Sequence, residues 1–153
     1  MEFGGESGAC SLRPGGAIQR IDSNTMTKAI DCPFCSLPDS RIIAGDERAV
    51  VIRDGFPVSP GHTLIIPRRH VASFFDATFE ERTSLFGLLE EQKAVLEREF
   101  RPDGYNFGIN DGAAAGQTVP HLHLHLIPRY QGDSPDPRGG VRWVLPKTAK
   151  YWP

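Results

Sequence analysis

Three of the five histidines in this chain of 153 residues stand at alternate positions in one short stretch. His121, His123 and His125 are separated by leucines, and a period of two is the repeat of a β-strand. A strand over Val119–Arg129 would place the imidazoles on one face and the leucines on the other. A hydrophobic core has no need for three adjacent imidazoles, so the histidine face predicts a reaction site, a metal site or both.

Three uses of this face are open from the residues alone. The plainest is a solvated strand face, and strict alternation beside a buried leucine face argues against it. The second is a three-histidine zinc centre, although one strand cannot readily turn three spaced rings onto a single ion. In the third, the middle ring, His123, acts as a nucleophile, because neutral imidazole is nucleophilic near pH 7.

A second group with metal chemistry is the pair Cys32 and Cys35, which are separated by proline and phenylalanine. Two thiolates at this spacing can bind one tetrahedral ion, which then requires two further ligands. The alternative is two unligated thiols near a chain turn. Three cysteines do not suggest a disulfide framework, so their use is typical of a reducing cytoplasm.

The composition narrows the range of partners. A net charge of −2 argues against a nucleic-acid surface built on bulk positive charge. No apolar run is long enough to span a bilayer, and the start of the chain lacks the pattern of a secretory signal. We therefore expect a cytoplasmic protein that binds neither nucleic acid nor membrane.

One long helix and several short strands have to position these side chains. The helix is expected to begin near Thr78, because Thr78 and Glu81 have the spacing of a capping box, and Arg101–Gly104 should end it. Strands besides the histidine strand are predicted at Arg41–Ala44, Ala49–Arg53, His62–Pro67 and Tyr105–Asn110.

Short turns between these strands favour an antiparallel sheet, so the predicted fold class is α+β. In the strand at 105–110 we place the tyrosine, phenylalanine and isoleucine in the core. The predicted organisation is a poorly ordered extension at 1–30, a folded domain at 31–130, and a tail at 131–153 docked on the domain or on a partner subunit.

The ordered motifs resemble one known family. His121–Ile127 matches the His-φ-His-φ-His-φ-φ signature (φ, apolar) of the histidine triad superfamily of nucleotide hydrolases and transferases. Gly108–Pro120 is similar to the matching segment of its fragile-histidine-triad and diadenosine-polyphosphate hydrolase branch. Pro60–Pro67 is similar to the family's other landmark strand, and the resemblance covers roughly Cys32 to Tyr130.

The resemblance implies a division of roles among the histidines. His123 would attack the α-phosphorus and form a nucleotidyl-histidine intermediate, which water then hydrolyses. His125 would contact phosphate oxygens, and His62 would support the triad from the neighbouring strand. The activity implied is hydrolysis of a dinucleoside polyphosphate or a related adenine nucleotide. A nucleotidyltransferase and a nucleotide-binding module with little activity are the alternatives.

The resemblance also implies residues that bind the substrate. Asp54 matches the position that holds the ribose hydroxyls, with a turn-forming role as its alternative. Asn110 would lie near the nucleotide, or else serve only as a turn residue. Gln117 and Thr118 would sit beside the leaving group, and we include Gly116 with these residues.

The last implications concern metal and assembly. Bacterial members of the superfamily show a Cys-Cys-His-His zinc site, and this chain has all four positions. A structural zinc ion is therefore expected, and the family also implies a five-stranded antiparallel sheet with one long helix and a homodimer. The expected zinc ligands are Cys32, Cys35, His70 and His121.

Overall fold

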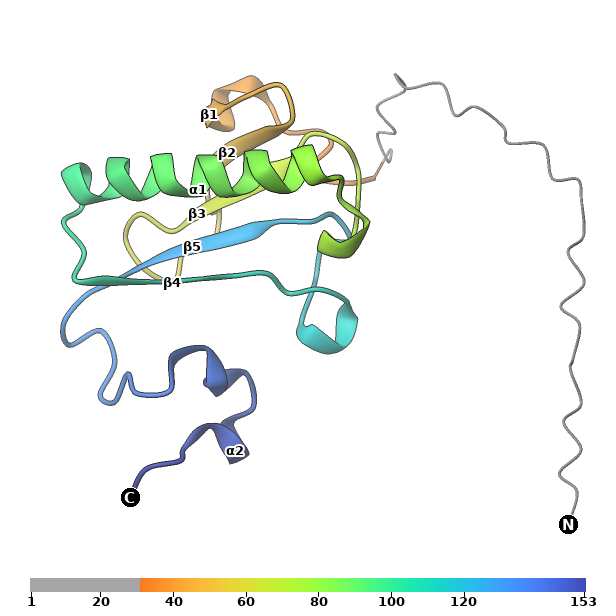
Figure 1. Ribbon diagram of the computed structural model, residues 1–153. Coiled ribbons are helices and arrows are strands. Elements are labelled where there is room, and N and C mark those ends of the chain that lie inside the picture. Colours follow the sequence, from red (N-terminus) through yellow and green to blue (C-terminus); the bar gives the residue numbers. More distant parts are fainter. Residues whose placement is uncertain (1–30) are drawn as a thin grey trace, which may run out of the picture.

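The computed structural model describes residues 31–153, which are built around one antiparallel sheet of five strands with one long helix packed on it (Figure 1). The strand order is β1-β2-β3-β5-β4, and every neighbouring pair is antiparallel. The predicted α+β class is confirmed, whereas the predicted extension at 1–30 lies outside the described residues. The strands are β1 Ile42–Gly45, β2 Ala49–Arg53, β3 Thr63–Pro67, β4 Gly104–Gly108 and β5 Leu124–Arg129.

Helix α1 spans Phe79–Glu99 and begins with the predicted capping box. The Glu81 backbone N–H donates to the Thr78 hydroxyl at 3.2 Å, and the Thr78 N–H donates to the Glu81 carboxylate at 2.8 Å. The Arg69 guanidinium donates two more hydrogen bonds to this carboxylate, and they lower the pKa of Glu81. Because Arg69 follows β3, this ion pair fixes the start of the helix against the sheet.

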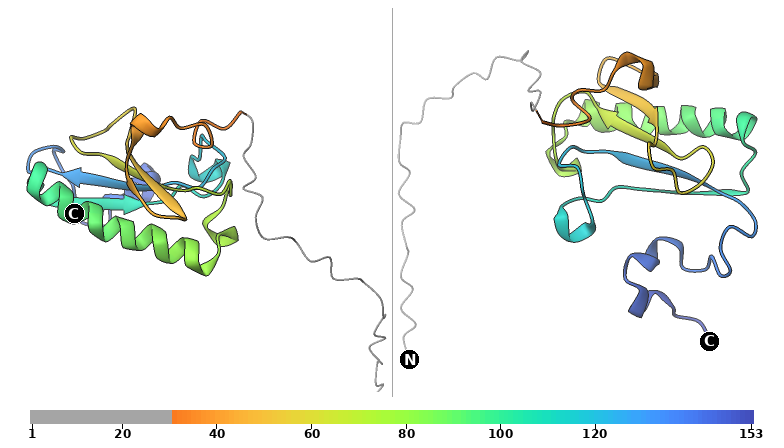
Figure 2. Two further views of the ribbon diagram at one scale, coloured as in Figure 1. Left: turned by 90° about the horizontal axis from the view of Figure 1, so that it is seen from above. Right: turned by 180° about the vertical axis from the view of Figure 1, so that it is seen from behind.

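The two faces of the sheet are covered by different parts of the chain, and this decides where the site lies. Helix α1 packs on one face, whereas the segment before β1 packs on the other (Figure 2). Alternating side chains along β2 and β3 supply both cores, as the period of a strand requires. The helix-side core contains Val51, Ile65, Leu85, Leu88, Leu122 and Leu124. The opposite core contains Val50, Ile52, Leu64 and Ile66, packed against Phe34, Leu37 and Ile42.

Strand β5 is shorter than the predicted histidine strand. It begins at Leu124, so only His125 of the three histidines lies within it. Pro120, which precedes the histidines, has no backbone N–H. The N–H groups of the next two residues donate to carbonyls outside the sheet. The His121 N–H donates to the Val119 carbonyl at 2.8 Å, and the Leu122 N–H donates to the Val71 carbonyl at 2.6 Å. The alternation of the leucines persists nonetheless, because all three are buried.

Strand β4 corrects part of the predicted core face of residues 105–110, of whose three apolar residues Ile109 packs against the helix-side core. Phe107 is 55 % exposed, and Tyr105 and Ile109 are only half-buried. The reason is that β4 is the edge strand, whereas α1 packs mainly over β2, β3 and β5. The aromatic side chains of β4 therefore lie beside α1 and not beneath it, and Tyr105 contacts Lys93 on the helix surface.

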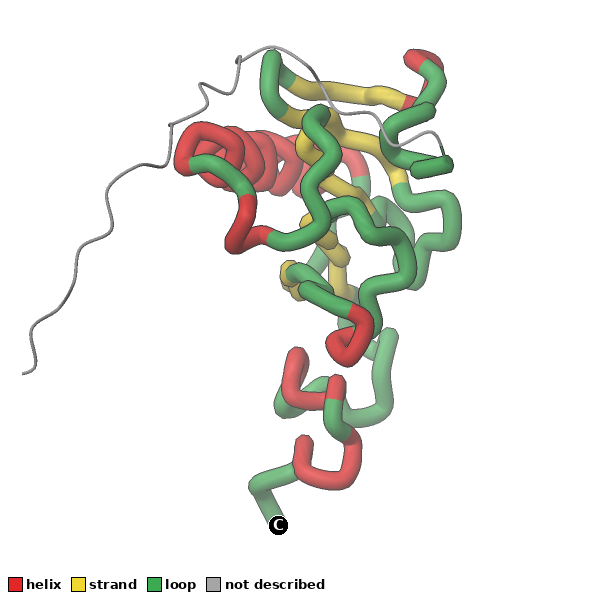
Figure 3. The backbone as a smooth tube through the Cα atoms, turned by 90° about the vertical axis from the view of Figure 1, so that its right-hand side faces the viewer, coloured by secondary structure: helices red, strands yellow, loops and turns green. Residues whose placement is uncertain are grey.

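Residues 131–153 form a tail of short helical turns beyond the β4 edge, including α2 at Pro146–Ala149 (Figure 3). The Trp143 indole N–H donates to the Arg138 carbonyl at 2.7 Å, and the Arg138 guanidinium lies 4.8 Å from the Trp152 ring centroid. Both tryptophans of the tail thus contact Arg138, which belongs to the tail itself. Docking of the tail on the domain or on a partner stays a prediction. Within residues 31–153, no helix has both the length and the apolar character of a membrane span.

Candidate active site and metal centre

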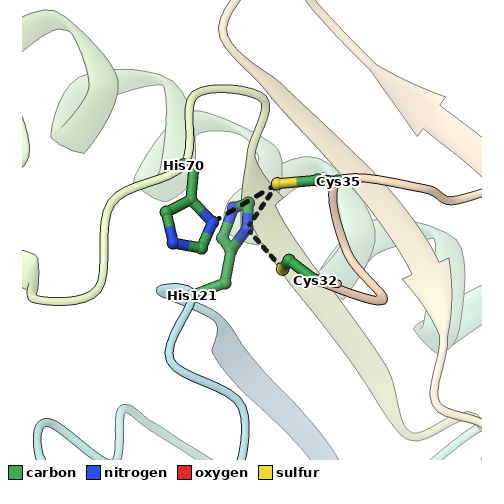
Figure 4. A group of neighbouring side chains, drawn as sticks. All are labelled: Cys32, Cys35, His70 and His121. Atoms are coloured by element: carbon green, nitrogen blue, oxygen red, sulfur yellow. Dashed lines mark hydrogen bonds between the residues drawn. The ribbon is translucent and has the colours of Figure 1, made fainter. Parts of the chain in front are cut away.

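A cluster of two thiols and two imidazoles lies between the start of the domain and the segment that leads into β5 (Figure 4). Its four candidate ligand atoms all lie within 4.8 Å of one another. His70 comes from the segment after β3, so three separate parts of the chain meet here. The four residues brought together are Cys32, Cys35, His70 and His121.

The distances within this cluster match a tetrahedral metal site. The His121 Nδ1 atom lies 3.4 Å from Cys32 Sγ and 3.5 Å from Cys35 Sγ, and His70 Nδ1 lies 3.3 Å from Cys35 Sγ. Zinc bonds of about 2.3 Å to sulfur and 2.05 Å to nitrogen place tetrahedral neighbours about 3.6 Å apart. The observed sulfur–nitrogen distances are within a few tenths of an ångström of that value, so the residues present fit zinc.

The backbone fixes which nitrogen of His121 faces the thiols. His121 Nε2 lies 2.8 Å from the Pro67 carbonyl oxygen, which can only accept a hydrogen bond. The hydrogen is therefore on Nε2, and the lone pair on Nδ1 points at both sulfur atoms. Complete burial lowers the pKa of His121, which keeps the ring neutral and able to ligate a metal.

His123 is oriented by the residue two positions before it. Its Nδ1 atom lies 2.7 Å from the His121 carbonyl oxygen. This Nδ1 carries the hydrogen, because a carbonyl only accepts, and the lone pair is left on Nε2. A buried imidazole that is held by a hydrogen bond at Nδ1 and has a lone pair available on Nε2 is the arrangement that nucleophilic catalysis requires.

His125 lies on the same sheet face as the opposite core, because it pairs with Leu64 of β3. Its ring centroid is 5.0 Å from that of His123, and its Nδ1 atom lies 3.0 Å from Nε2 of His62. Its own Nε2 atom is buried and has no hydrogen-bond partner among the described residues. Burial, together with the neighbouring histidines, lowers the pKa of His125 to about 4.

Asp54 lies at the end of β2, beside His62. Its Oδ1 atom accepts the Phe56 N–H at 2.8 Å, and its Oδ2 atom lies 3.4 Å from His62 Nδ1. The Asp54 N–H donates to the His62 carbonyl at 3.0 Å, so the ladder between β2 and β3 continues to this point. The turn-forming role of Asp54 is thus observed. Its carboxylate also lies next to the histidine network, by which we mean the contacting rings of His62, His125 and His123.

The loop before the histidines carries the other predicted substrate residues. Asn110 and Gln117 are half-buried, whereas Gly116 and Thr118 are exposed. The side chain of Gln117 bonds to backbone on both sides, accepting from the Gly112 N–H and donating to the Ala72 carbonyl at 2.8 Å. In this arrangement Gln117 holds the loop, and its contact with a leaving group stays a prediction.

Phe34 is a site residue that the sequence reasoning missed. Its ring centroid lies 5.8 Å from that of His121 and 5.2 Å from that of His123. The Phe34 ring therefore packs edge-on against both histidines and is an apolar contact shared by the thiol cluster and the middle histidine. The sequence could have indicated this role, because Phe34 stands between Cys32 and Cys35. If both cysteines bind one metal ion, the position of the side chain between them is fixed as well.

Comparisons with known proteins agree with this geometry. A family model described as "HIT domain" matches residues 37–132. A bis(5'-nucleosyl)-tetraphosphatase (asymmetrical) of Schizosaccharomyces pombe is 47% identical over 77 residues, which are 50% of this chain and 42% of that protein.

Two solved structures are similar to this fold. A HIT family protein from Bacillus anthracis has a TM-score of 0.64 and 38% identity, covering 69% of this chain and 77% of its own. A Zn-bound histidine triad family protein from Mycobacterium smegmatis has a TM-score of 0.62 and 33% identity, covering 74% of this chain and 90% of its own.

Proposed function

The chain belongs to the HIT domain family, whose members include nucleotide hydrolases, and from this premise we propose that it cleaves nucleotidyl substrates at the α-phosphate. The substrate class is a dinucleoside polyphosphate or a related phosphoanhydride or phosphoramidate of an adenine nucleotide. The reaction proceeds through a nucleotidyl-histidine intermediate on His123.

The observation that carries this proposal is the fixed tautomer of His123. Its Nδ1–H donates to the His121 carbonyl at 2.7 Å, so Nε2 presents its lone pair without rearrangement. The neighbouring His125 holds a buried Nε2 atom with no partner among the described residues. Attack on an anionic phosphate requires a nucleophile, here His123, and beside it a polar atom that can bind a phosphate oxygen, here Nε2 of His125.

In the first step His123 Nε2 forms a bond to the α-phosphorus, and the bond from this phosphorus to the leaving oxygen or nitrogen breaks. In the second step water attacks the same phosphorus and releases a proton to the solvent, the phosphorus–nitrogen bond breaks with its electron pair returning to His123 Nε2, and a nucleoside monophosphate leaves. His125 contacts the phosphate oxygens in both steps, where a hydrogen bond stabilises the added negative charge.

The nucleoside is held on the same face of the sheet. The Asp54 carboxylate accepts hydrogen bonds from the two ribose hydroxyls, beside the histidine network that it already contacts. A groove lined by Phe34, Leu37 and Ile42 offers an apolar surface for the base. Asn110, Gly116, Gln117 and Thr118 belong to the loop that faces the leaving group.

Zinc, when bound by the thiol cluster, has a structural role. Four protein ligands close the coordination shell, so no position is left for water or substrate. Two thiolates also balance the charge of Zn²⁺, which makes the burial of Cys32 and His121 electrostatically favourable. The ion would thereby fix His121, whose carbonyl orients His123.

The proposed reaction is tested by product analysis in water enriched in ¹⁸O. Diadenosine tetraphosphate, an adenosine phosphoramidate and an acyl-adenylate are each expected to yield AMP, and the label is expected in the AMP. Label in the leaving group, or cleavage that occurs only when a phosphorylated acceptor is added, would refute hydrolysis at the α-phosphate. Tight binding of AMP without turnover of any of these substrates would favour the binding module instead.

A homodimer is the second part of this proposal. Strand β4 is an edge strand, and an edge with exposed apolar side chains invites pairing with another sheet. An apolar groove of about 340 Å³ lies between β4 and α1, and Phe86 and Phe107 at its rim are 44 % and 55 % exposed. We infer that a second copy covers this groove, which joins the two sheets across β4.

Replacement of Phe107 by aspartate is expected to weaken the dimer by about 30-fold or more, because a central aromatic contact contributes about 2 kcal/mol. Light scattering over a dilution series measures this change. The matched control is Phe79→Asp, since Phe79 is 79 % exposed on α1 but lies outside the groove. A wild-type protein that is monomeric at micromolar concentration would contradict the dimer.

A further inference from the structure

Two polar groups compete for one ring nitrogen of His62. The Val58 N–H donates to His62 Nδ1 at 3.3 Å, and Asp54 Oδ2 lies 3.4 Å from the same nitrogen. A backbone N–H only donates and a carboxylate only accepts, so one protonation state of Nδ1 cannot satisfy both. Nδ1 carries either a lone pair for Val58 or a hydrogen for Asp54.

The other nitrogen of His62 transmits this choice to His125. His62 Nε2 and His125 Nδ1 are 3.0 Å apart and share a single hydrogen. Burial lowers the pKa of both rings, so both are neutral near pH 7. If His62 Nδ1 has the lone pair, His62 donates to His125, and His125 Nε2 bears a hydrogen. If His62 Nδ1 has the hydrogen, the bond reverses, and His125 Nε2 bears a lone pair.

The two arrangements contain the same number of hydrogens. In passing from the second to the first, the shared hydrogen moves from His125 to His62. One proton leaves His62 Nδ1 to water, and one is taken from water at His125 Nε2. Only the first arrangement gives His125 a hydrogen to donate to a phosphate oxygen, whereas a lone pair at the same place repels it.

We propose that Asp54, acting through His62, decides whether His125 donates to or repels the substrate phosphate. This inference rests on the proposed function, in which Asp54 binds the ribose hydroxyls. Without a nucleoside, the Asp54 carboxylate draws the hydrogen to His62 Nδ1. When two hydroxyls donate to the carboxylate, its attraction for that hydrogen weakens, and the Val58 N–H determines the tautomer. Binding of the ribose thereby prepares the phosphate site.

Nuclear magnetic resonance of the ¹⁵N-labelled protein can read both tautomers directly. Adenosine, which has no phosphate, is expected to change the tautomer ratio of His125 by at least about tenfold toward Nε2–H. A tenfold change corresponds to about 1.4 kcal/mol, which is no more than a hydrogen bond to a charged group contributes. The same occupancy of 2',3'-dideoxyadenosine, which lacks both hydroxyls, should leave the ratio unchanged. Equal effects of the two ligands would overturn the inference.

A substitution provides an independent arm. Asp54→Asn is expected to give His125 its Nε2–H without any ligand, because the amide has no negative charge and can itself donate to His62 Nδ1. The matched control is Glu91→Gln, which removes an exposed carboxylate of α1 and should leave both tautomers as in the wild type. An Asp54→Asn spectrum with wild-type tautomers would also refute the inference. If adenosine does not bind at all, the proposed function fails; if it binds without a change of tautomer, only this inference fails.

Discussion

The His123→Ala variant is expected to lose at least about 10⁴-fold in kcat/KM for a dinucleoside polyphosphate, while its affinity for AMP stays within a few-fold of the wild type. The reason is that, among the three triad histidines of the described domain, His123 combines a fixed tautomer with an uncommitted Nε2 lone pair. His121 faces the thiols, and His125 bonds to His62. Steady-state kinetics and calorimetric titration with AMP measure the two quantities separately.

The role of His123 can be separated from a loss of folding by chemical rescue. A His123→Gly variant leaves space for added imidazole, which should restore part of the turnover by supplying the missing nucleophile. Quenching the wild type during turnover with an alkaline denaturant should trap one nucleotidyl group on His123, detectable by mass spectrometry, because the phosphorus–nitrogen bond to histidine is labile in acid. Turnover of His123→Ala within tenfold of the wild type, or an adduct on another residue, would refute the covalent mechanism.

The sequence was sufficient for those parts of the site that side-chain pattern determines. The period of two brings His123 and His125 together, and the spacing of Cys32 and Cys35 places two thiols at one point. His70 and His121, the other two ligands that the resemblance implies, lie beside these thiols. The sequence could not predict which backbone groups form hydrogen bonds to the histidine rings. The carbonyls of Pro67 and His121 fix two tautomers, and every residue type has such a group.

The errors in the fold have a related cause. Alternation in residues 105–110 predicted which side chains share a face but not whether a helix covers that face, because coverage depends on the position of the strand in the sheet. Phe107 is exposed since β4 is at the edge. The start of β5 was predicted too early because hydrogen bonds to Val71 and Val119, set by neighbouring loops, replace the ladder before Leu124.

Loss of the metal is expected to affect stability before chemistry. The Cys35→Ser variant should bind less than a tenth of the zinc that the wild type holds, and its melting temperature should fall by about 10–20 °C. This range corresponds to about 3–5 kcal/mol for a domain of this size. The loss is smaller than the full binding energy of zinc in peptides, because the sheet and α1 core do not depend on the cluster. Elemental analysis and calorimetry measure the two effects.

Cys10→Ser is the matched control, because Cys10 is the one cysteine of the chain that is not a predicted zinc ligand. It should leave zinc content and melting temperature unchanged, whereas a chelator should bring the wild type to the stability of Cys35→Ser. An unchanged melting temperature after complete removal of zinc would refute a structural ion. The chemistry should fall less than in His123→Ala, because the Pro67 carbonyl still bonds His121 and the His121 carbonyl still orients His123 when the metal is absent.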